Sequence, residues 1–144
     1  MDRVAKSPPA DRADLFRRAA VSLQPERSPL IVEKDFWVCW VLRQLFEVIR
    51  YRPHLIFKGG TSLSKAYSVI DRFSEDVDLS LSRRDLGFAD DHAPEQKGIS
   101  AKESRRRLES LTESCKKSIR ESLLPKLQED FAGELGSEGW RLEI

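Results

Sequence analysis

The stretch from Leu55 to Leu81, LIFKGGTSLSKAYSVIDRFSEDVDLSL, constrains the fold more than any other part of the chain. The apolar run Leu55–Phe57 predicts a buried strand, and the pair Gly59-Gly60 predicts a turn that leads into a short helix. After a loop, Val77–Leu81 predicts a second strand. This order of elements predicts an α/β or α+β fold in which a small mixed sheet is flanked by helices.

Two carboxylates mark the start of the second predicted strand. Asp76 and Asp78 lie two residues apart, and strand side chains alternate, so both are expected to leave the same face of the sheet. Magnesium prefers oxygen ligands from one or two carboxylates together with substrate phosphates. Alone, the pair would also fit a polar strand face that is open to water. The adjoining glycine turn, where backbone amides can approach a phosphate, favours a site for a nucleoside triphosphate with magnesium.

Several polar residues around the turn are candidates for holding the phosphates. Thr61 and Ser62 can cap the amides at the start of the helix or donate a hydroxyl to a phosphate oxygen. Lys65 follows one turn later and has either a surface role or an anion-binding role. Arg72 and Ser74 lie in the loop before the aspartates, where a guanidinium can grip a triphosphate. With Gly59 and Gly60, these residues form the predicted nucleotide site.

Upstream, a proline after a serine predicts the start of a helix over Pro29–Ile49, with apolar residues almost all the way round. Lys34 and Asp35 fall inside its apolar sector and therefore need partners. Either they form a structural ion pair or a contact at the rim of the core, or Lys34, together with Glu33, faces the metal and triphosphate site, with Lys34 and Asp35 lying behind its direct ligands. Trp37 and Trp40 are spaced for packing in the core.

The C-terminal third is predicted to contain a long loop over residues 82–99 and a helix from Ser100 to about Leu124. One sector of this helix is basic, which indicates either a solvated face or a track for an RNA backbone. The basic sector contains Lys102, Arg105, Arg106, Lys116, Lys117 and Arg120. After a glycine-containing turn, alternation over Trp140–Ile144 predicts a final strand.

The strings KGGTSLSKAY and RFSEDVDLSL, with VEKDFWVCWVL upstream, resemble the AbiEii/AbiGii toxin family of type IV toxin-antitoxin systems. That family has the nucleotidyltransferase fold of the polymerase-beta superfamily, and the resemblance covers residues 28–81. It implies that Asp76 and Asp78 hold magnesium and support transfer of a nucleotidyl group from an NTP to an acceptor hydroxyl. It also implies transfer RNA as the acceptor, an arrest of translation, and a cognate antitoxin as partner.

The same resemblance implies a third carboxylate on a later strand. We do not expect this chain to contain that strand. Glu143 could take that place only if the final strand lay beside Asp78. We therefore expect a helical lead-in over residues 1–27, its first ten residues flexible, and a nucleotidyltransferase core over 28–144 that is the N-terminal part of a larger toxin. The alternatives are a non-catalytic, nucleotide-binding remnant or interaction module, and a transferase acting on a small molecule.

The composition limits the cellular setting. Lys and Arg total 25 against 24 for Asp and Glu, so a nucleic-acid partner must be met by a local patch. Cys39 and Cys115 have no ligand spacing and are expected to be reduced thiols. The N-terminus lacks the apolar region of a signal peptide, and the longest apolar stretch, Leu30–Ile49, contains five charged residues. We expect a cytoplasmic protein with no membrane partner.

Overall fold

The computed structural model describes residues 1–23, 25–48, 51, 54–67 and 76–142. These residues form an α+β fold, which confirms the predicted class. The α-helices are α1 (Asp2–Ala5), α2 (Pro9–Ser22), α3 (Pro29–Arg43), α4 (Gly59–Lys65), α5 (Ala101–Ser118) and α6 (Leu124–Leu135). The strands are β1 (Leu55–Lys58) and β2 (Asp78–Leu81). Short π-helical turns span Gln44–Val48 and Ile119–Leu123, and a 3₁₀ turn spans Asp90–His92.

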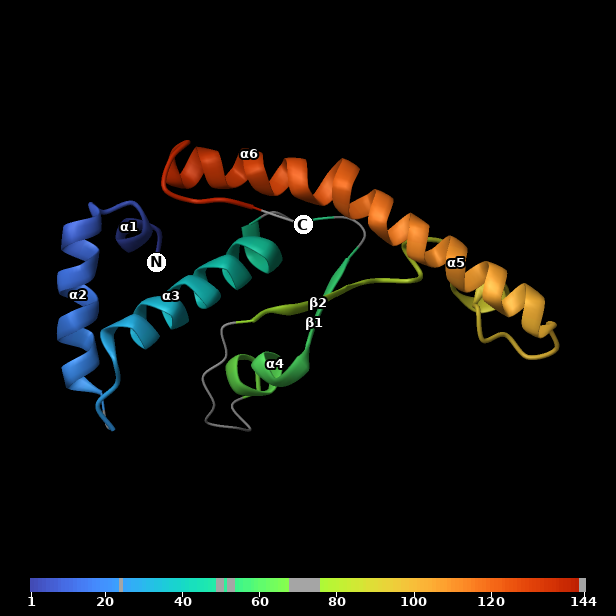
Figure 1. The fold of residues 1–144 in the computed structure, drawn as a ribbon, viewed down its shortest axis with the longest axis horizontal. Coiled ribbons are helices and arrows are strands. Elements are labelled where there is room, and N and C mark those ends of the chain that lie inside the picture. Colours follow the sequence, from blue (N-terminus) through green and yellow to red (C-terminus); the bar gives the residue numbers. More distant parts are fainter. Residues whose placement is uncertain (24, 49–50, 52–53, 68–75, 143–144) are drawn as a thin grey trace.

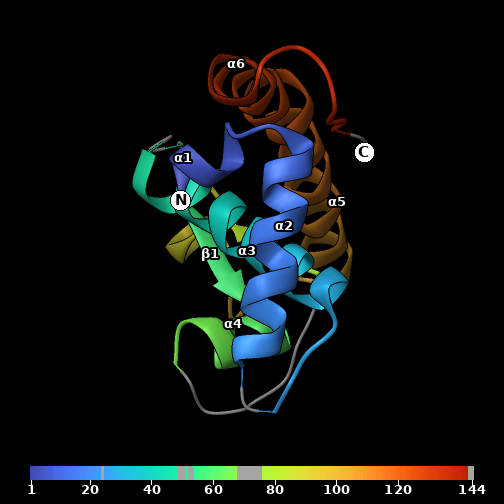
Figure 2. The ribbon, with the colours of Figure 1, turned by 90° about the vertical axis from the view of Figure 1, so that its left-hand side faces the viewer.

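The first ten residues contain α1 and the start of α2 and contact the rest of the molecule, so the expectation of a flexible lead-in is wrong. The Asp2 carboxylate accepts hydrogen bonds from the Arg43 guanidinium at 2.7 Å and from the Trp40 indole at 3.1 Å. Ala5 is buried in the core. The α2 helix then packs along α3 (Figure 2), and Phe16 meets Phe36 with ring centroids 5.4 Å apart. These partners lie far along the chain, so local composition could not reveal them.

The central helix α3 forms as predicted but ends at Arg43, after which the chain continues as a π-helical turn. Its aromatic residues belong to the core, which confirms the packing role of Trp37 and Trp40. Trp40 is only 1% exposed and lies between the rings of Trp37 and Phe131, with centroids 5.8 and 5.1 Å away. The contact with Phe131 joins α3 to α6.

The two strands pair antiparallel, whereas a mixed sheet was expected; the described residues add no further strand. The register places Leu55 opposite Leu81 and Lys58 opposite Asp78. Because strand side chains alternate, the leucines share one face and the lysine shares the other face with the aspartate. The apolar face packs against the core, with Leu81 9% exposed.

The segment 82–99 lacks regular structure except for the 3₁₀ turn, as predicted, but it is attached to α5. The Arg107 guanidinium donates to the carbonyls of Asp91 and Ala93 and to the side chain of Gln96, at 2.7, 3.1 and 2.8 Å. The helix from Ser100 also forms as predicted, with the Ser100 hydroxyl accepting from the Glu103 amide as an N-cap. It extends away from the rest of the molecule as an arm (Figure 1).

The predicted strand over Trp140–Ile144 does not form in its described part, since Trp140–Leu142 has no regular secondary structure. The Trp140 indole instead donates to the Gly136 carbonyl at 2.7 Å, and its ring packs edge-on against Phe131. Residues 143 and 144, including the candidate carboxylate Glu143, lie outside the described residues.

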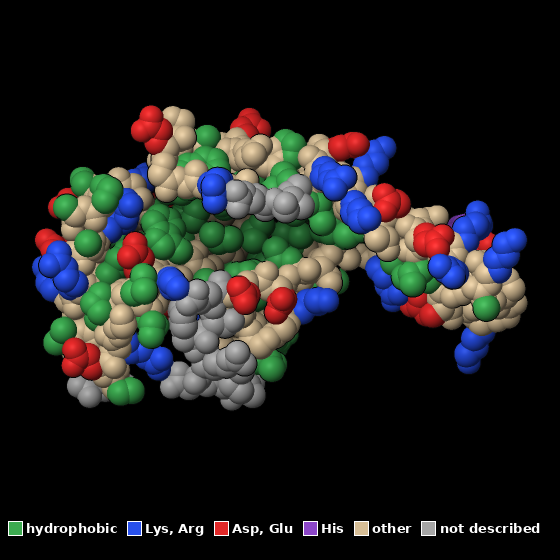
Figure 3. Space-filling model, viewed as in Figure 1, with side chains coloured by type: hydrophobic (Ala, Val, Ile, Leu, Met, Phe, Trp, Pro, Cys, Tyr) green, Lys and Arg blue, Asp and Glu red, His purple; other side chains and the backbone are tan. Residues whose placement is uncertain are grey.

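Figure 3 shows hydrophobic side chains gathered in a hollow between α6 on one side and α3 and the sheet on the other. At the α5 end of the molecule, Lys and Arg side chains mingle with acidic ones. Both cysteines are free thiols, as expected. None of the helices formed by the described residues has the length and apolar character needed to span a bilayer.

Candidate active site

The centre of the candidate site is the contact between the glycine turn and the second aspartate. Gly59 is the first residue of α4 and has φ +74°, a backbone conformation that residues with a side chain rarely adopt. A Cβ added to Gly59 would overlap the Oδ2 atom of Asp78 and would lie 2.8 Å from its Cγ. The Asp78 carboxylate therefore lies directly against the turn. Gly60, by contrast, has open space where a Cβ would point.

The first aspartate is connected to the same turn through its main chain. Asp76 lies just before β2, and its carbonyl accepts a hydrogen bond of 2.6 Å from the Thr61 hydroxyl. Thr61 is only 2% exposed. The neighbouring Ser62 hydroxyl donates to the Gly59 carbonyl at 2.8 Å. The hydroxyls of Thr61 and Ser62, which the sequence offers to a phosphate, thus both donate to main-chain carbonyls, one before β2 and one in the turn.

The donor set of the site suits a hard divalent cation. The side chains of Asp76 and Asp78 are exposed, and neither forms an ion pair with another described residue. Among the described residues, no group of three or more metal-ligating side chains is found. Two carboxylates fit magnesium, which commonly takes one or two from the protein and completes its shell with water and substrate phosphates.

Lys58, the last residue of β1, also belongs to the candidate site. It is directly opposite Asp78 in the β1–β2 register, and both are exposed on the same face. Opposite residues in an antiparallel pair have Cβ atoms about 4.5–5.5 Å apart. Alternation from the apolar Leu55 and Phe57 would have predicted the face, but only the register reveals the aspartate beside it.

Lys65, at the end of α4, forms an ion pair with Asp35 on α3. The Lys65 side chain is 22% exposed and that of Asp35 is 38% exposed. Asp35 thus has the structural partner that its position in an apolar sector required, while Lys34 has a contact of its own elsewhere. Cys39 lies one turn beyond Asp35, and burial raises the pKa of its thiol. Arg72 and Ser74 lie outside the described residues.

The predicted basic stripe on α5 is partly neutralised by glutamates of its own helix. Arg105 pairs with Glu109, Arg106 with Glu103 and Lys116 with Glu113, at 2.8 to 3.1 Å. Lys117 and Glu121 are 3.9 Å apart. For Lys102 and Arg120, no ion pair with another described residue is found. The stripe therefore has an excess of positive charge on an exposed arm, with its side chains held in place by neighbouring carboxylates.

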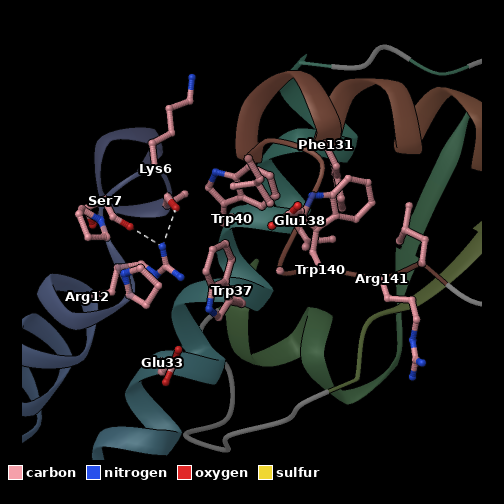
Figure 4. Close-up of a pocket in the computed structure, with 17 residues that line it drawn as sticks. Lys6, Ser7, Arg12, Glu33, Trp37, Trp40, Phe131, Glu138, Trp140 and Arg141 are labelled. Atoms are coloured by element: carbon pink, nitrogen blue, oxygen red, sulfur yellow. Dashed lines mark hydrogen bonds between the residues drawn. The ribbon is translucent and has the colours of Figure 1, made fainter.

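A separate cavity of about 700 Å³ lies between the N-terminal helices, α3 and the segment after α6. Figure 4 shows Trp37, Trp40 and Trp140 around it, and these are the three tryptophans of the chain. At its edge, the Arg12 guanidinium lies 5.6 Å from the centroid of the Trp37 ring and donates to the Ala5 carbonyl at 3.2 Å. Nothing in its lining resembles the carboxylate pair of the candidate site.

Comparison with known proteins gives one match. The family model described as nucleotidyl transferase AbiEii toxin, type IV TA system, matches residues 40–144. This range includes the glycine turn, both aspartates and the arm. No curated protein matches the chain, and no solved structure matches it.

Proposed function

Because the chain belongs to the AbiEii family of nucleotidyltransferase toxins from type IV toxin-antitoxin systems, we propose that it transfers a nucleotidyl group from an NTP to an RNA hydroxyl. Magnesium is the cofactor in this proposal, transfer RNA the acceptor and a cognate antitoxin the partner. The single observation that carries the proposal is the seating of the Asp78 carboxylate against the Gly59 turn. That contact brings a metal-ligating group and a side-chain-free backbone together, as nucleotidyl transfer requires.

In this proposal the protein acts in the cytoplasm. Asp76 and Asp78 would hold the magnesium ion. When bound, the metal would neutralise charge on the phosphates and polarise the α-phosphate. The two carboxylates satisfy the ligand chemistry of magnesium, and their exposure leaves room for substrate oxygens and water to complete the shell.

The remaining residues of the site would bind and orient the triphosphate. The bare surface of Gly60 admits close approach of a phosphate, since nothing lies where its Cβ would be. Lys58 supplies positive charge on the face of Asp78, and Lys65, which pairs with Asp35 at the far end of α4, keeps its predicted role towards the triphosphate. Ser62 fixes the turn through its bond to Gly59. Arg72 and Ser74 keep the nucleotide-binding role that the resemblance implies.

The arm would bind the acceptor. Arg105, Arg106, Lys116, Lys117 and Arg120 project from an exposed helix in which positive charges outnumber negative ones. Phosphate contacts by such residues give affinity that falls with salt concentration. Replacing Lys116, Lys117 and Arg120 with alanine should weaken RNA binding and reduce its salt dependence. If the acceptor were instead a small molecule, the same replacement would leave transfer unchanged.

A labelling assay tests the reaction. The protein is incubated with magnesium, total RNA and each NTP labelled at the α-phosphate, in parallel with Asp76→Ala and Asp78→Ala. Asp14→Ala is the matched control, because Asp14 is an exposed carboxylate on α2 whose one ion-pair partner among the described residues is Arg17. We expect label in RNA with the parent and the control, and its loss with the two site variants. Equal labelling with the site variants would remove the aspartates from the mechanism, and no labelling with any protein would favour a non-catalytic binding module.

A further inference from the structure

We propose that Gly59 and Thr61 are positioning residues that hold the two aspartates in the arrangement a divalent cation needs. This inference rests on the proposed function, and it assigns to the start of α4 a role distinct from phosphate binding. The turn would act first on the protein's own carboxylates, and only then on the nucleotide.

Gly59 acts on Asp78 through space. Its missing side chain makes room for the carboxylate, because a Cβ would overlap Oδ2 and lie 2.8 Å from Cγ and 3.1 Å from Cβ of Asp78. These neighbours belong to a short side chain whose backbone is held by the pairing with β1, so the carboxylate can make room only by changing its rotamer. Any larger residue at position 59 would push the carboxylate away from the turn. Gly60, one residue later, faces open space and carries no such requirement.

Thr61 acts on Asp76 through a hydrogen bond. Its hydroxyl is the donor in the 2.6 Å bond to the Asp76 carbonyl, and the residue is almost completely buried. Asp76 lies outside β2, so ladder hydrogen bonds of that strand do not fix its main chain. The threonine supplies the missing restraint. Because the Thr61 hydroxyl already donates its hydrogen to the Asp76 carbonyl, it positions the aspartate and does not donate to a phosphate.

The two contacts come from residues two apart at the start of one helix and end on acidic residues two apart in the chain. Each depends on different chemistry, an absent side chain in one case and a hydroxyl donor in the other. Together they make α4 the element that sets where both carboxylates lie relative to one another. Residues that orient metal ligands in this way typically change metal affinity about 10–100-fold when replaced.

The test measures metal affinity directly, without catalysis. Mn²⁺ serves as the probe for the magnesium site, and its binding is followed by the loss of the free-ion electron paramagnetic resonance signal. Thr61→Val removes the hydroxyl at nearly constant volume, and Thr61→Ser restores it. Gly87→Ala is the control for Gly59→Ala, because Gly87 also has a positive φ, of +84°, but has open space where a Cβ would point and lies outside the candidate site. Far-UV circular dichroism and Tm are recorded for every variant, so that a Gly59→Ala protein that fails to fold is recognised. In that case, the comparison of Thr61→Val with Thr61→Ser decides the test.

We expect Thr61→Val and Gly59→Ala to weaken Mn²⁺ binding about 10–100-fold. Thr61→Ser and Gly87→Ala should bind Mn²⁺ as the parent does. Parent-like Mn²⁺ binding by folded Thr61→Val would overturn the inference while leaving the proposed function standing. Weakened binding in the variants, with no nucleotide transfer by the parent, would retain the inference and reject the reaction. A parent that binds no Mn²⁺, with or without NTP, would overturn both.

Discussion

The ammonium group of Lys65 donates to the carboxylate of Asp35, thirty residues earlier in the chain, and so connects α4 to α3. The helix that carries Gly59 and Thr61 is only seven residues long, and Leu63 within it and Tyr67 just after it are exposed. Such a short helix has little stability of its own, so its orientation depends on tertiary contacts. The ion pair is one of these contacts, and it lies on the opposite end of α4 from the aspartates.

A double-mutant cycle should detect this connection. Asp35→Asn and Lys65→Gln are each expected to lower the free energy of unfolding by less than about 1 kcal/mol, because both side chains are partly exposed. Their effects should not add, since each removes the same pair. Urea denaturation of the two single variants and the double variant gives the coupling energy. A coupling no larger than that of the exposed pair Arg17–Asp14 would contradict a role in fixing α4.

Replacing Trp40 with alanine should cost about 3–5 kcal/mol in the free energy of unfolding. Its ring is almost fully buried between Trp37 and Phe131, and its indole N–H donates to Asp2. Truncation would leave a cavity, and the Asp2 carboxylate would lose one of its hydrogen-bond donors. Urea denaturation followed by circular dichroism measures the loss. Tyr67→Ala is the control, because Tyr67 is 70% exposed and its removal should change stability little.

Replacing Arg107 with alanine should release the segment 82–99 from the arm. The guanidinium makes three hydrogen bonds to residues 91, 93 and 96, and its side chain is only 20% exposed. Trypsin should then cleave after Lys97 severalfold faster, which mass spectrometry of the fragments would reveal. Arg105→Ala is the control, since Arg105 pairs with Glu109 on its own helix and has no hydrogen bond or ion pair with the described segment 82–99. Equal cleavage rates in the two variants would show that the segment is held by other contacts.

The N-terminal end of α5 should weaken in acid. Hydrogen bonds from Arg106 and then Arg107 lower the pKa of Glu103 from 4.5 to about 2. A carboxylate whose folded pKa is depressed stabilises the folded state above its unfolded pKa. This stabilisation is lost as the pH falls from about 4.5 towards 2. Titration of the Glu103 side-chain carbon by NMR should show the low pKa, and Arg106→Ala should raise it. An ordinary pKa in the parent would contradict these contacts.

Much of the candidate site could be predicted from the sequence because its parts are close together in the chain. The strand, glycine turn, helix and second strand form one continuous unit, and alternation and turn chemistry indicate each piece. The same local signals correctly predicted α3, the tryptophan core and the helix after Ser100. The predicted final strand does not form over its described residues, Trp140–Leu142, because a short alternation is a weak signal and the packing of Trp140 on Phe131 prevailed.

By itself, then, the sequence determined the α+β framework and which residues are candidates for the chemistry, a pair of aspartates beside a glycine turn. Only the tertiary structure decided what those residues touch. In that structure the Asp78 carboxylate lies against Gly59, and Thr61 is hydrogen-bonded to Asp76. Lys58 lies on the same face of the sheet as Asp78, and Lys65 pairs with Asp35. The physical reason is that backbone periodicity shows the direction of a side chain. Strand register and long-range packing, which depend on the whole chain, select its neighbour.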